Sequence, residues 1–354
     1  MTTGDLLDAT LESIRPVDAD ALTAARARQL ELTKPPGSLG QLEELGNQLA
    51  AISGQCPPPV PTPALACVFA GDHGVTAQRV SPWPQDVTWQ MVMNVAAGGA
   101  SVNVLARHAG ADVRAYDVGI VHELSDERVR NRRVAAGTAD CSIGAAMTRE
   151  QATEALEIGI QAALDAAADG YLCLVPGEVG IGNTTPAAAL VSVFTGQSAA
   201  EVTGAGAGAV GEMLDRKREV VARSIEVNAA TAADPLGALA AIGGFEHAAI
   251  AGLVLGAAAC RLPVLLDGVI ACSGALAAVA MCPDARGYLI AGHDGAEPGI
   301  RAALDSLGLR PILAMDLRLG EGSGALTALP VVQASAKILR EMATFASAGV
   351  SGKQ

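Results

Sequence analysis

Two glutamates in this sequence lie among glycines, in short polar segments where a carboxylate could meet a bound molecule. Glu321 stands between Gly320 and Gly322 in LRLGEGSGA, and Glu178 lies in PGEVGIGNTT. Glycine adopts backbone angles that other residues avoid, and it has no side chain to keep a ligand away. Either glutamate could therefore act as a general base. The residues leave an alternative open, in which each acid only satisfies nearby backbone amides.

The segment PGEVGIGNTT is also a candidate anion site. It sets Gly180, Gly182 and Asn183 between a predicted strand and a predicted helix that begins at Pro186. Backbone amides at a helix N-terminus, together with the helix dipole, bind phosphate groups. We expect a phosphate or a sugar here, although a plain strand-to-helix turn could have the same sequence. The spacing fits neither G-x-G-x-x-G nor a P-loop, so it indicates neither a dinucleotide nor a triphosphate.

A second glycine-rich stretch could contact the same kind of ligand. TGAGAGAVGEMLDRK contains Gly204 and Gly206 and then Lys217 on a predicted helix. The chain has a net charge of −13, so a phosphorylated ligand would need a local cation, which Lys217 could supply as a point charge. A flexible loop followed by a solvated lysine is the alternative.

Two other polar segments follow the first predicted strand. Asp72 and His73 in GDHGV are either ligand contacts or turn residues. SPWPQDVTWQ, residues 81–90, contains Trp83 and Trp89, the two tryptophans of the chain. They could stack on a flat aromatic ligand or fix the loop in place.

The composition excludes several classes of protein. Hydrophobic residues make up 50% of the chain and charged residues 17%, which argues against disorder. The acidic net charge argues against a nucleic-acid partner. The uncharged stretches are shorter than the ~20 residues that span a membrane, and the first residues lack an export signal. Seven scattered cysteines are typical of reduced thiols in a cytoplasmic protein, and five histidines without ligand spacing predict no metal site. We expect no cofactor.

Alternating strands and helices would position these segments. Apolar runs begin near residues 64, 112, 171, 262, 287 and 312, each followed by a loop that contains glycine. Helices are predicted over 149–168, opened by a capping box of Thr148 and Gln151, and over 186–195 and 212–230. Runs that are apolar throughout indicate a parallel sheet with helices on both faces. Ligands of such sheets bind at the carboxyl ends of the strands.

The two ends of the chain differ from this pattern. The first 50 residues suggest two helices around KPPGSLG, with Ser38 and Gln41 as a capping box, and the proline-rich region 51–63 leads into the sheet. A further helix is predicted over 331–346. We predict a small helical domain from residues 1–60 and 331–354, and a large α/β catalytic domain over 61–330.

Six motifs, taken together and in order, resemble the nicotinate-nucleotide:dimethylbenzimidazole phosphoribosyltransferase family. They are KPPGSLG, FAGDHGV, GGASVNVLAR, GEVGIGNTT, LLDG and LRLGEGSGA, and they extend from about residue 30 to about residue 340. The resemblance implies a Rossmann-like domain, a small helical domain and a homodimer. It also implies that 5-phosphoribose passes from nicotinate mononucleotide to 5,6-dimethylbenzimidazole, giving nicotinate and the α-ribazole 5′-phosphate of the cobalamin nucleotide loop.

The same resemblance implies roles for individual residues. Glu321 would be the catalytic base, and Glu178, in the nucleotide site, is the next candidate. Ser81 and Gln90 would contact the benzimidazole, and Lys217 would contact the phosphate or ribose. The substrate-binding residues that it implies are Ser81, Gln90, Gly180, Gly182, Asn183, Gly204, Gly206, Lys217, Asp267, Gly268 and Gly320.

One base would suffice for this chemistry. The glycosidic nitrogen of nicotinate mononucleotide is cationic and departs as a neutral pyridine, so no general acid is required, in contrast to glycoside hydrolysis. A glutamate in a dry, apolar cavity has a raised pKa, which suits it to take the benzimidazole proton.

Two rival functions are also considered. A nicotinamide-dependent dehydrogenase is disfavoured, because the chain lacks G-x-G-x-x-G with an acidic residue about 20 positions later. A non-catalytic carrier of benzimidazole ribosides would use Glu321 only as a hydrogen-bond acceptor. Release of nicotinate from nicotinate mononucleotide would distinguish the carrier from the transferase.

Overall fold

A parallel β-sheet forms the centre of the protein, which a computed structural model describes over residues 4–351. Six parallel strands run in the order β3-β2-β1-β4-β5-β6. They are β1 (Ala64–Gly71), β2 (Ala111–Gly119), β3 (Val129–Asn131), β4 (Cys173–Val179), β5 (Val264–Leu266) and β6 (Leu289–Ala291). This is the strand order of the Rossmann fold: β2 and β3 are added on one side of β1, and β4, β5 and β6 on the other. The Rossmann-like fold predicted from the sequence is therefore confirmed.

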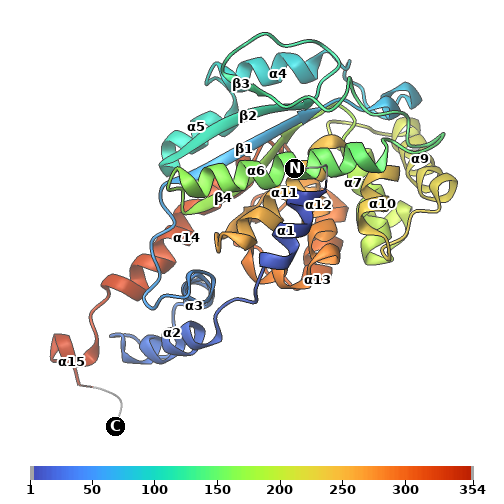
Figure 1. Cartoon of the computed structure of the whole chain (residues 1–354). Helices are drawn as coiled ribbons and strands as arrows, with labels where there is room; N and C mark the ends of the chain where they lie inside the picture. Colours follow the sequence, from blue (N-terminus) through green and yellow to red (C-terminus); the bar gives the residue numbers. More distant parts are fainter. Residues whose placement is uncertain (1–3, 352–354) are drawn as a thin grey trace.

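Helices cover both faces of this sheet, as Figure 1 shows for α4 and α5 on one side and α6 and α11 on the other. The first face packs on α4 (Val87–Ala96), α5 (Ser101–Ala109) and α14 (Ser323–Glu341). The second packs on α6 (Arg149–Ala168), α7 (Thr184–Thr195), α10 (Pro235–Ile242), α11 (Phe245–Ala259), α12 (Val269–Met281) and α13 (Pro298–Leu307). Strand residues contact the two faces alternately: Leu65 and Phe69 the second, Ala66 and Val68 the first.

The abundance of small residues allows the helices to pack closely. A side chain at Gly159 of α6 would collide with the carbonyl of Ala249 in α11. A side chain at Gly252 of α11 would in turn collide with the carbonyl of Leu156 in α6. The two helices therefore meet backbone to backbone, which only glycine permits at these positions.

Most predicted elements agree with the structure, with shifts at their ends. The α6 capping box of Thr148 and Gln151 is confirmed. Helix α7 begins two residues before Pro186, at Thr184, and α9 covers Glu212–Asn228. The apolar run near residue 312 does not join the main sheet, because β8 (Leu313–Ala314) pairs only with β7 (His293–Asp294). The shorter elements are β3, α8 (Ala199–Val202) and the 3-10 helices η1 (Gly74–Gln78) and η2 (Pro283–Tyr288).

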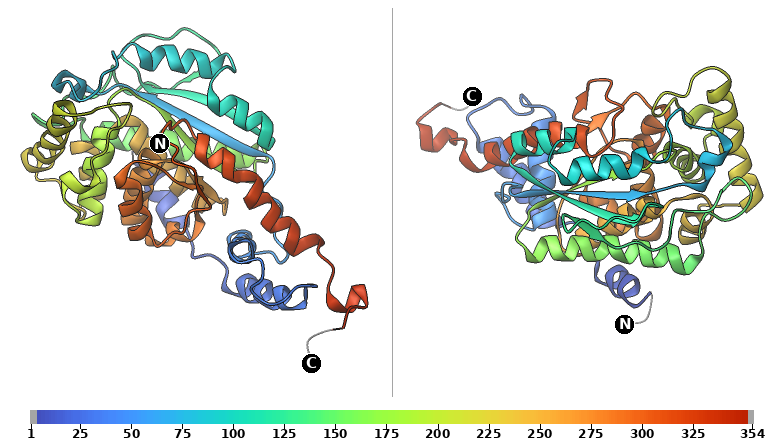
Figure 2. Two further views of the ribbon diagram at one scale, coloured as in Figure 1. Left: turned by 180° about the vertical axis from the view of Figure 1, so that it is seen from behind. Right: turned by 90° about the horizontal axis from the view of Figure 1, so that it is seen from above.

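A small helical group lies beside the sheet, toward the C-terminus (Figures 1 and 2). It consists of α2 (Ala19–Glu31), α3 (Gln41–Ser53), the end of α14 and α15 (Phe345–Ala348). Its core contains Ala25, Leu32, Ala50 and Leu339. The predicted capping box of Ser38 and Gln41 is wrong, because Gly40 is the N-cap of α3 and no side chain caps it.

Two helices make contacts near the predicted domain boundaries. Helix α1 (Asp5–Ser13) packs against α6 and α11 of the large domain, and Glu157 of α6 accepts hydrogen bonds from the backbone amides of Gly4 and Leu6. Helix α14 passes through residue 331 without a break. The division at residues 60 and 331 therefore stays a prediction. Between residues 4 and 351, no helix combines the length and hydropathy needed to cross a bilayer.

Candidate active site

A cavity of about 760 Å³ opens at the carboxyl ends of the central strands. Its volume lies within the range typical of small-molecule sites. Glu178 at the end of β4 and Asp267 just after β5 both line it, together with the loop that precedes α14. Every predicted site residue lines the cavity except Gln90 and Gly204. The fold thus brings together residues from distant parts of the chain, while their roles stay predictions.

Glu321 lies in an unusual backbone segment at the edge of this cavity. Gly320, Glu321 and Gly322 have φ angles of +86°, +63° and +93°, so the segment is left-handed throughout. This conformation is strained for a glutamate and is favoured by glycine on either side. A side chain at Gly177 of β4 would collide with the carbonyl of Glu321, so the loop lies directly against the strand. The glycines therefore let the loop turn and hold Glu321 in place.

The surroundings of Glu321 favour proton uptake. The residue is only 5% exposed, and burial raises the pKa of its carboxyl. The amide of Val102, at the start of α5, opposes this rise by donating a 3.4 Å hydrogen bond to Oε2. The negative charge of Asp267 raises the pKa further. A raised pKa brings a carboxylate nearer to the range of an effective general base.

Glu178 has a different environment. Burial, followed by the charges of Asp267 and Glu246, raises the pKa of Glu178 to about 8, so this acid is mostly protonated at neutral pH. Asn183 donates a hydrogen bond to its Oε2 over 2.5 Å, and the backbone amide of Glu321 donates another. A side chain at Gly320 would collide with Oε1. Glu178 thus supports the Glu321 loop and is poorly suited to accept a proton at pH 7.

Asp267 anchors the helix that follows this loop. Its Oδ2 accepts a 3.1 Å hydrogen bond from the amide of Gly322, and its Oδ1 accepts a 3.0 Å bond from the amide of Ala325. Nε2 of His293 lies 3.3 Å from Oδ1. Asp267 therefore caps the N-terminus of α14, where a negative charge is favourable. Both carboxylate oxygens are engaged by the protein, which indicates a positioning role.

Lys217 supplies a buried cation beside the predicted anion site. Its Nζ donates hydrogen bonds to Thr184 Oγ1 over 2.8 Å and to the carbonyl of Gly204 over 3.0 Å. Thr184 is the first residue of α7, so the lysine adjoins a helix N-terminus. Burial lowers the pKa of Lys217 to about 8, opposed by the carboxylate of Glu297. Glu297 also accepts a hydrogen bond from the amide of Gly206 over 2.7 Å.

Two predicted contacts are not brought into the cavity. Gly204 does not line it, and instead its carbonyl fixes the position of Lys217. Gln90 is exposed on α4, whereas Val87 and Met91 line the cavity. Val87 and Met91 are four residues apart and share one face of α4, whereas Gln90 is turned by about 100° from Met91. The polar Gln90 was expected to contact the benzimidazole, whereas the structure has the apolar Met91 at the cavity.

Several cavity residues were not indicated by the sequence patterns. Arg318, an exposed cation, lies in the LRLGEG motif itself, so that motif could have drawn attention to it. Three of the others also lie in quoted motifs, Ser101 and Leu105 in GGASVNVLAR and Ile181 in GEVGIGNTT, but their residue types gave no sign of a ligand contact. These additional lining residues include Ser101, Leu105, Ile181 and His293.

The tryptophans have separate environments. Trp83 lines the cavity and donates a 2.9 Å hydrogen bond from Nε1 to the carbonyl of Ala207, which connects its loop to the glycine-rich loop. Trp89 stacks on His122, with ring centroids 4.6 Å apart, and does not line the cavity. Trp83 is thus the tryptophan that could contact a ligand.

Comparison with known proteins agrees with this architecture. Residues 14–350 match the family described as Phosphoribosyltransferase. The chain is 51% identical to a nicotinate-nucleotide–dimethylbenzimidazole phosphoribosyltransferase of Salinispora tropica, with 98% of this chain and 100% of the relative aligned. It is 48% identical to one of Geobacter metallireducens, with 98% of each aligned.

Solved structures give the same result. A crystal structure of the enzyme of this name from Thermus thermophilus superposes with a TM-score of 0.90 at 45% identity, covering 95% of this chain and 100% of the other. Because the identity is this high over nearly complete chains, the similarity establishes the family as well as the fold. The chain belongs to the nicotinate-nucleotide–dimethylbenzimidazole phosphoribosyltransferase family.

Proposed function

We propose that this chain transfers 5-phosphoribose from nicotinate mononucleotide to 5,6-dimethylbenzimidazole, and that Glu321 is the general base. The observation that carries the proposal is the buried Glu321, held in a left-handed loop at the edge of the cavity. Its relatives of 51% and 48% identity are named for the same two substrates.

The two sides of the cavity suit the two substrates. Trp83, Val87, Met91 and Leu105 form an apolar surface that matches a flat bicyclic base. Lys217 and the N-terminus of α7 supply the positive charge and amides that suit a phosphate. Arg318 offers a second cation at the cavity for an anionic group.

The reaction then needs one proton transfer and one displacement. The Glu321 carboxylate takes the N–H proton of the benzimidazole, which leaves the opposite ring nitrogen with a more nucleophilic lone pair. That lone pair forms a bond to C1′ of the ribose, while the bond from C1′ to the pyridinium nitrogen breaks and its electrons return to nicotinate. Attack on the face opposite the leaving group turns the β-linkage into an α-linkage.

The rate enhancement has two sources, proton transfer and the positioning of the substrates. General-base help contributes about 10²–10⁴-fold, and holding both substrates in a reactive orientation supplies much of the remainder. Protonated Glu178 would act by positioning the Glu321 loop, since its pKa of about 8 keeps it neutral at pH 7.

Turnover tests the proposal directly. The purified protein is incubated with nicotinate mononucleotide and 5,6-dimethylbenzimidazole, and free nicotinate and the α-riboside phosphate are separated by chromatography. We expect both products in equal amounts. Binding of both compounds without nicotinate release would favour the carrier function instead.

We further propose that the protein works as a homodimer in the cytoplasm. The homodimer follows from the family resemblance, and the location from the scattered cysteines, which are typical of reduced thiols. Sedimentation velocity tests the first proposal: a single species with the mass of one chain would contradict it.

A further inference from the structure

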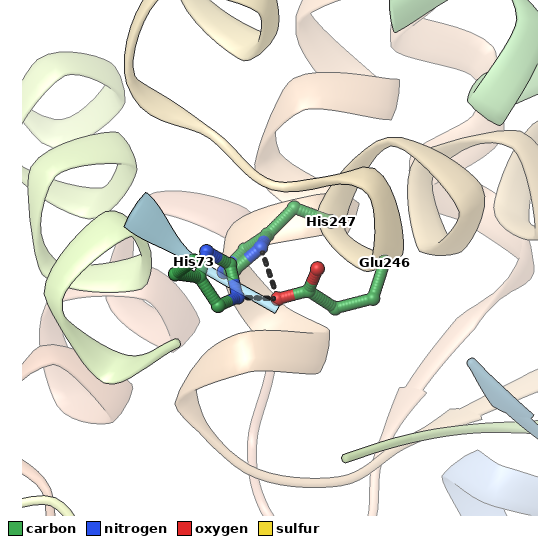
Figure 3. A group of neighbouring side chains, drawn as sticks. All are labelled: His73, Glu246 and His247. Atoms are coloured by element: carbon green, nitrogen blue, oxygen red, sulfur yellow. Dashed lines mark hydrogen bonds and ion pairs between the residues drawn. The ribbon is translucent and has the colours of Figure 1, made fainter. Parts of the chain in front are cut away.

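We propose that His73, Glu246 and His247 form a binding site for one Zn²⁺ ion, outside the substrate cavity (Figure 3). His73 follows β1, and the other two residues lie in the first turn of α11. None of the three lines the cavity. The inference does not depend on the proposed reaction, which uses no metal.

The three side chains converge on one point. Their potential ligand atoms all lie within 4.8 Å of one another. Nε2 of His73 is 2.6 Å from Glu246 Oε1, and Nδ1 of His247 is 2.9 Å from the same oxygen. The two imidazole rings are nearly perpendicular, at 82°, with centroids 5.9 Å apart. Ligands that surround one tetrahedral ion approach from such different directions.

Hydrogen bonds alone leave this cluster incompletely satisfied. Nδ1 of His247 has no hydrogen-bond partner despite its short distance to Oε1, so the ring nitrogen faces a point beside that oxygen. Oε2 of Glu246 also lacks a partner among the described residues. Nδ1 of His73 and Nε2 of His247 lack one too, but they lie on the far side of each ring and would not bind the ion. All three side chains are almost completely buried. Buried polar atoms normally have partners, and one cation would satisfy two imidazoles and the carboxylate together.

The donor set and its dimensions fit zinc. Imidazole nitrogen and carboxylate oxygen bind Zn²⁺ at about 2.0–2.2 Å, which separates neighbouring tetrahedral ligands by about 3.3 Å. The contacts of 2.6 and 2.9 Å would therefore open by about half an ångström. Either oxygen of Glu246 could supply the carboxylate ligand, since Oε2 has no other partner, and a water molecule would take the fourth position of the ion.

The charges around the cluster also suit a divalent cation. Two neutral imidazoles and one carboxylate leave a bound Zn²⁺ with one positive charge. The buried Asp72 adjoins His73 and interacts electrostatically with both His73 and Glu246. A buried charge is normally paired, and the carboxylate of Asp72 would balance the remaining positive charge of the zinc site.

The position of the cluster indicates a structural role for the ion. A side chain added at Gly180 would lie 3.3 Å from Nε2 of His73, so the cluster lies under the loop that includes Asn183. The ion would join the end of β1 to the start of α11 below the cavity. Zinc bound only in the folded state stabilises that state by mass action.

Metal content and thermal unfolding test the site. The protein is produced with added Zn²⁺, freed of any affinity tag, dialysed, and analysed by inductively coupled plasma mass spectrometry. We expect about one zinc per chain in the wild type, a loss of at least about tenfold in His73→Gln and His247→Gln, and no loss in His108→Gln. His108 is an exposed histidine on α5 and serves as the matched control. Zinc added to metal-free protein should raise the Tm of the wild type and of the His108→Gln control, but not the Tm of the two cluster variants.

Wild-type protein decides the question even if the variants do not fold. Less than about one zinc in ten chains, with no change in Tm on adding Zn²⁺, would show that protons alone hold the cluster. Zinc retained equally in both cluster variants would assign the ion to another place and overturn the proposal. Substitution with Co²⁺ provides a second reading, because tetrahedral coordination gives strong visible absorption.

Discussion

The substitution Glu321→Gln tests the role of the buried base most directly. Glutamine keeps the size of the side chain, and its amide oxygen can still accept the hydrogen bond from Val102. Both substrates should therefore bind as before. Because the amide cannot take a proton, the general-base contribution of about 10²–10⁴-fold is lost. This corresponds to about 3 to 5 kcal/mol of transition-state stabilisation.

The loss should appear in kcat. Initial rates of nicotinate release are measured by chromatography over a range of both substrates, with Glu44→Gln as a control at an exposed glutamate of α3. We expect kcat to fall by at least about 100-fold in Glu321→Gln, with each KM changed by less than about threefold. A kcat close to that of the wild type would refute the assignment of the base.

The pH dependence gives an independent reading of the same residue. Glu321 must be ionised to accept a proton, and burial raises its pKa above the usual 4.5. Activity should therefore fall as pH drops through this raised pKa. The residual activity of Glu321→Gln should lack that acid limb. An acid limb that survives in the variant would have to come from another group.

Further substitutions test the surrounding site. Lys217→Ala should raise the KM for nicotinate mononucleotide more than that for nicotinate riboside, and equal effects would remove Lys217 from the phosphate role. Asp267→Asn should weaken the cap of α14 and lower the free energy of unfolding by about 1–3 kcal/mol in urea titrations, together with kcat; unchanged stability would contradict the anchoring role. The pKa of Glu178, raised to about 8, makes wild-type stability fall as pH rises from about 5 to 8, because only the unfolded state releases this proton over that interval. In Glu178→Gln this part of the pH dependence should vanish from thermal melts, and an identical pH profile would show that Glu178 is ionised in the native state. Met91→Gln should raise the KM for dimethylbenzimidazole, whereas Gln90→Ala should leave it unchanged; the reverse result would restore Gln90 as the contact.

The sequence indicated those features that local chemistry determines. The glycines around Glu321 predicted a special backbone, and the structure has three consecutive left-handed residues there. The capping box of Thr148 and Gln151 predicted the start of α6. Apolar runs predicted the strands of the parallel sheet. In each case the cause lies within a few residues of its effect.

The features that the sequence did not indicate depend on contacts between distant segments. His73 and Glu246 are 173 residues apart, and only the packing of α11 against β1 brings them together. Asp267 could be predicted as a site residue, but its role as a cap depends on where α14 begins. Which residue of α4 lines the cavity, Met91 or Gln90, depends on how the helix is rotated about its axis. The sequence of a short helix does not determine that rotation.

Helix α14 has a consequence for how the two ends of the molecule communicate. It starts at Ser323, two residues after the base, and carries Leu339 into the core of the helical group (Figure 2). A continuous helix of this kind transmits tilt as well as position, apart from any bend at its internal Pro330. Crowding or truncation near the C-terminus would therefore be felt as a change in the aim of the Glu321 carboxylate, far from any residue that touches substrate.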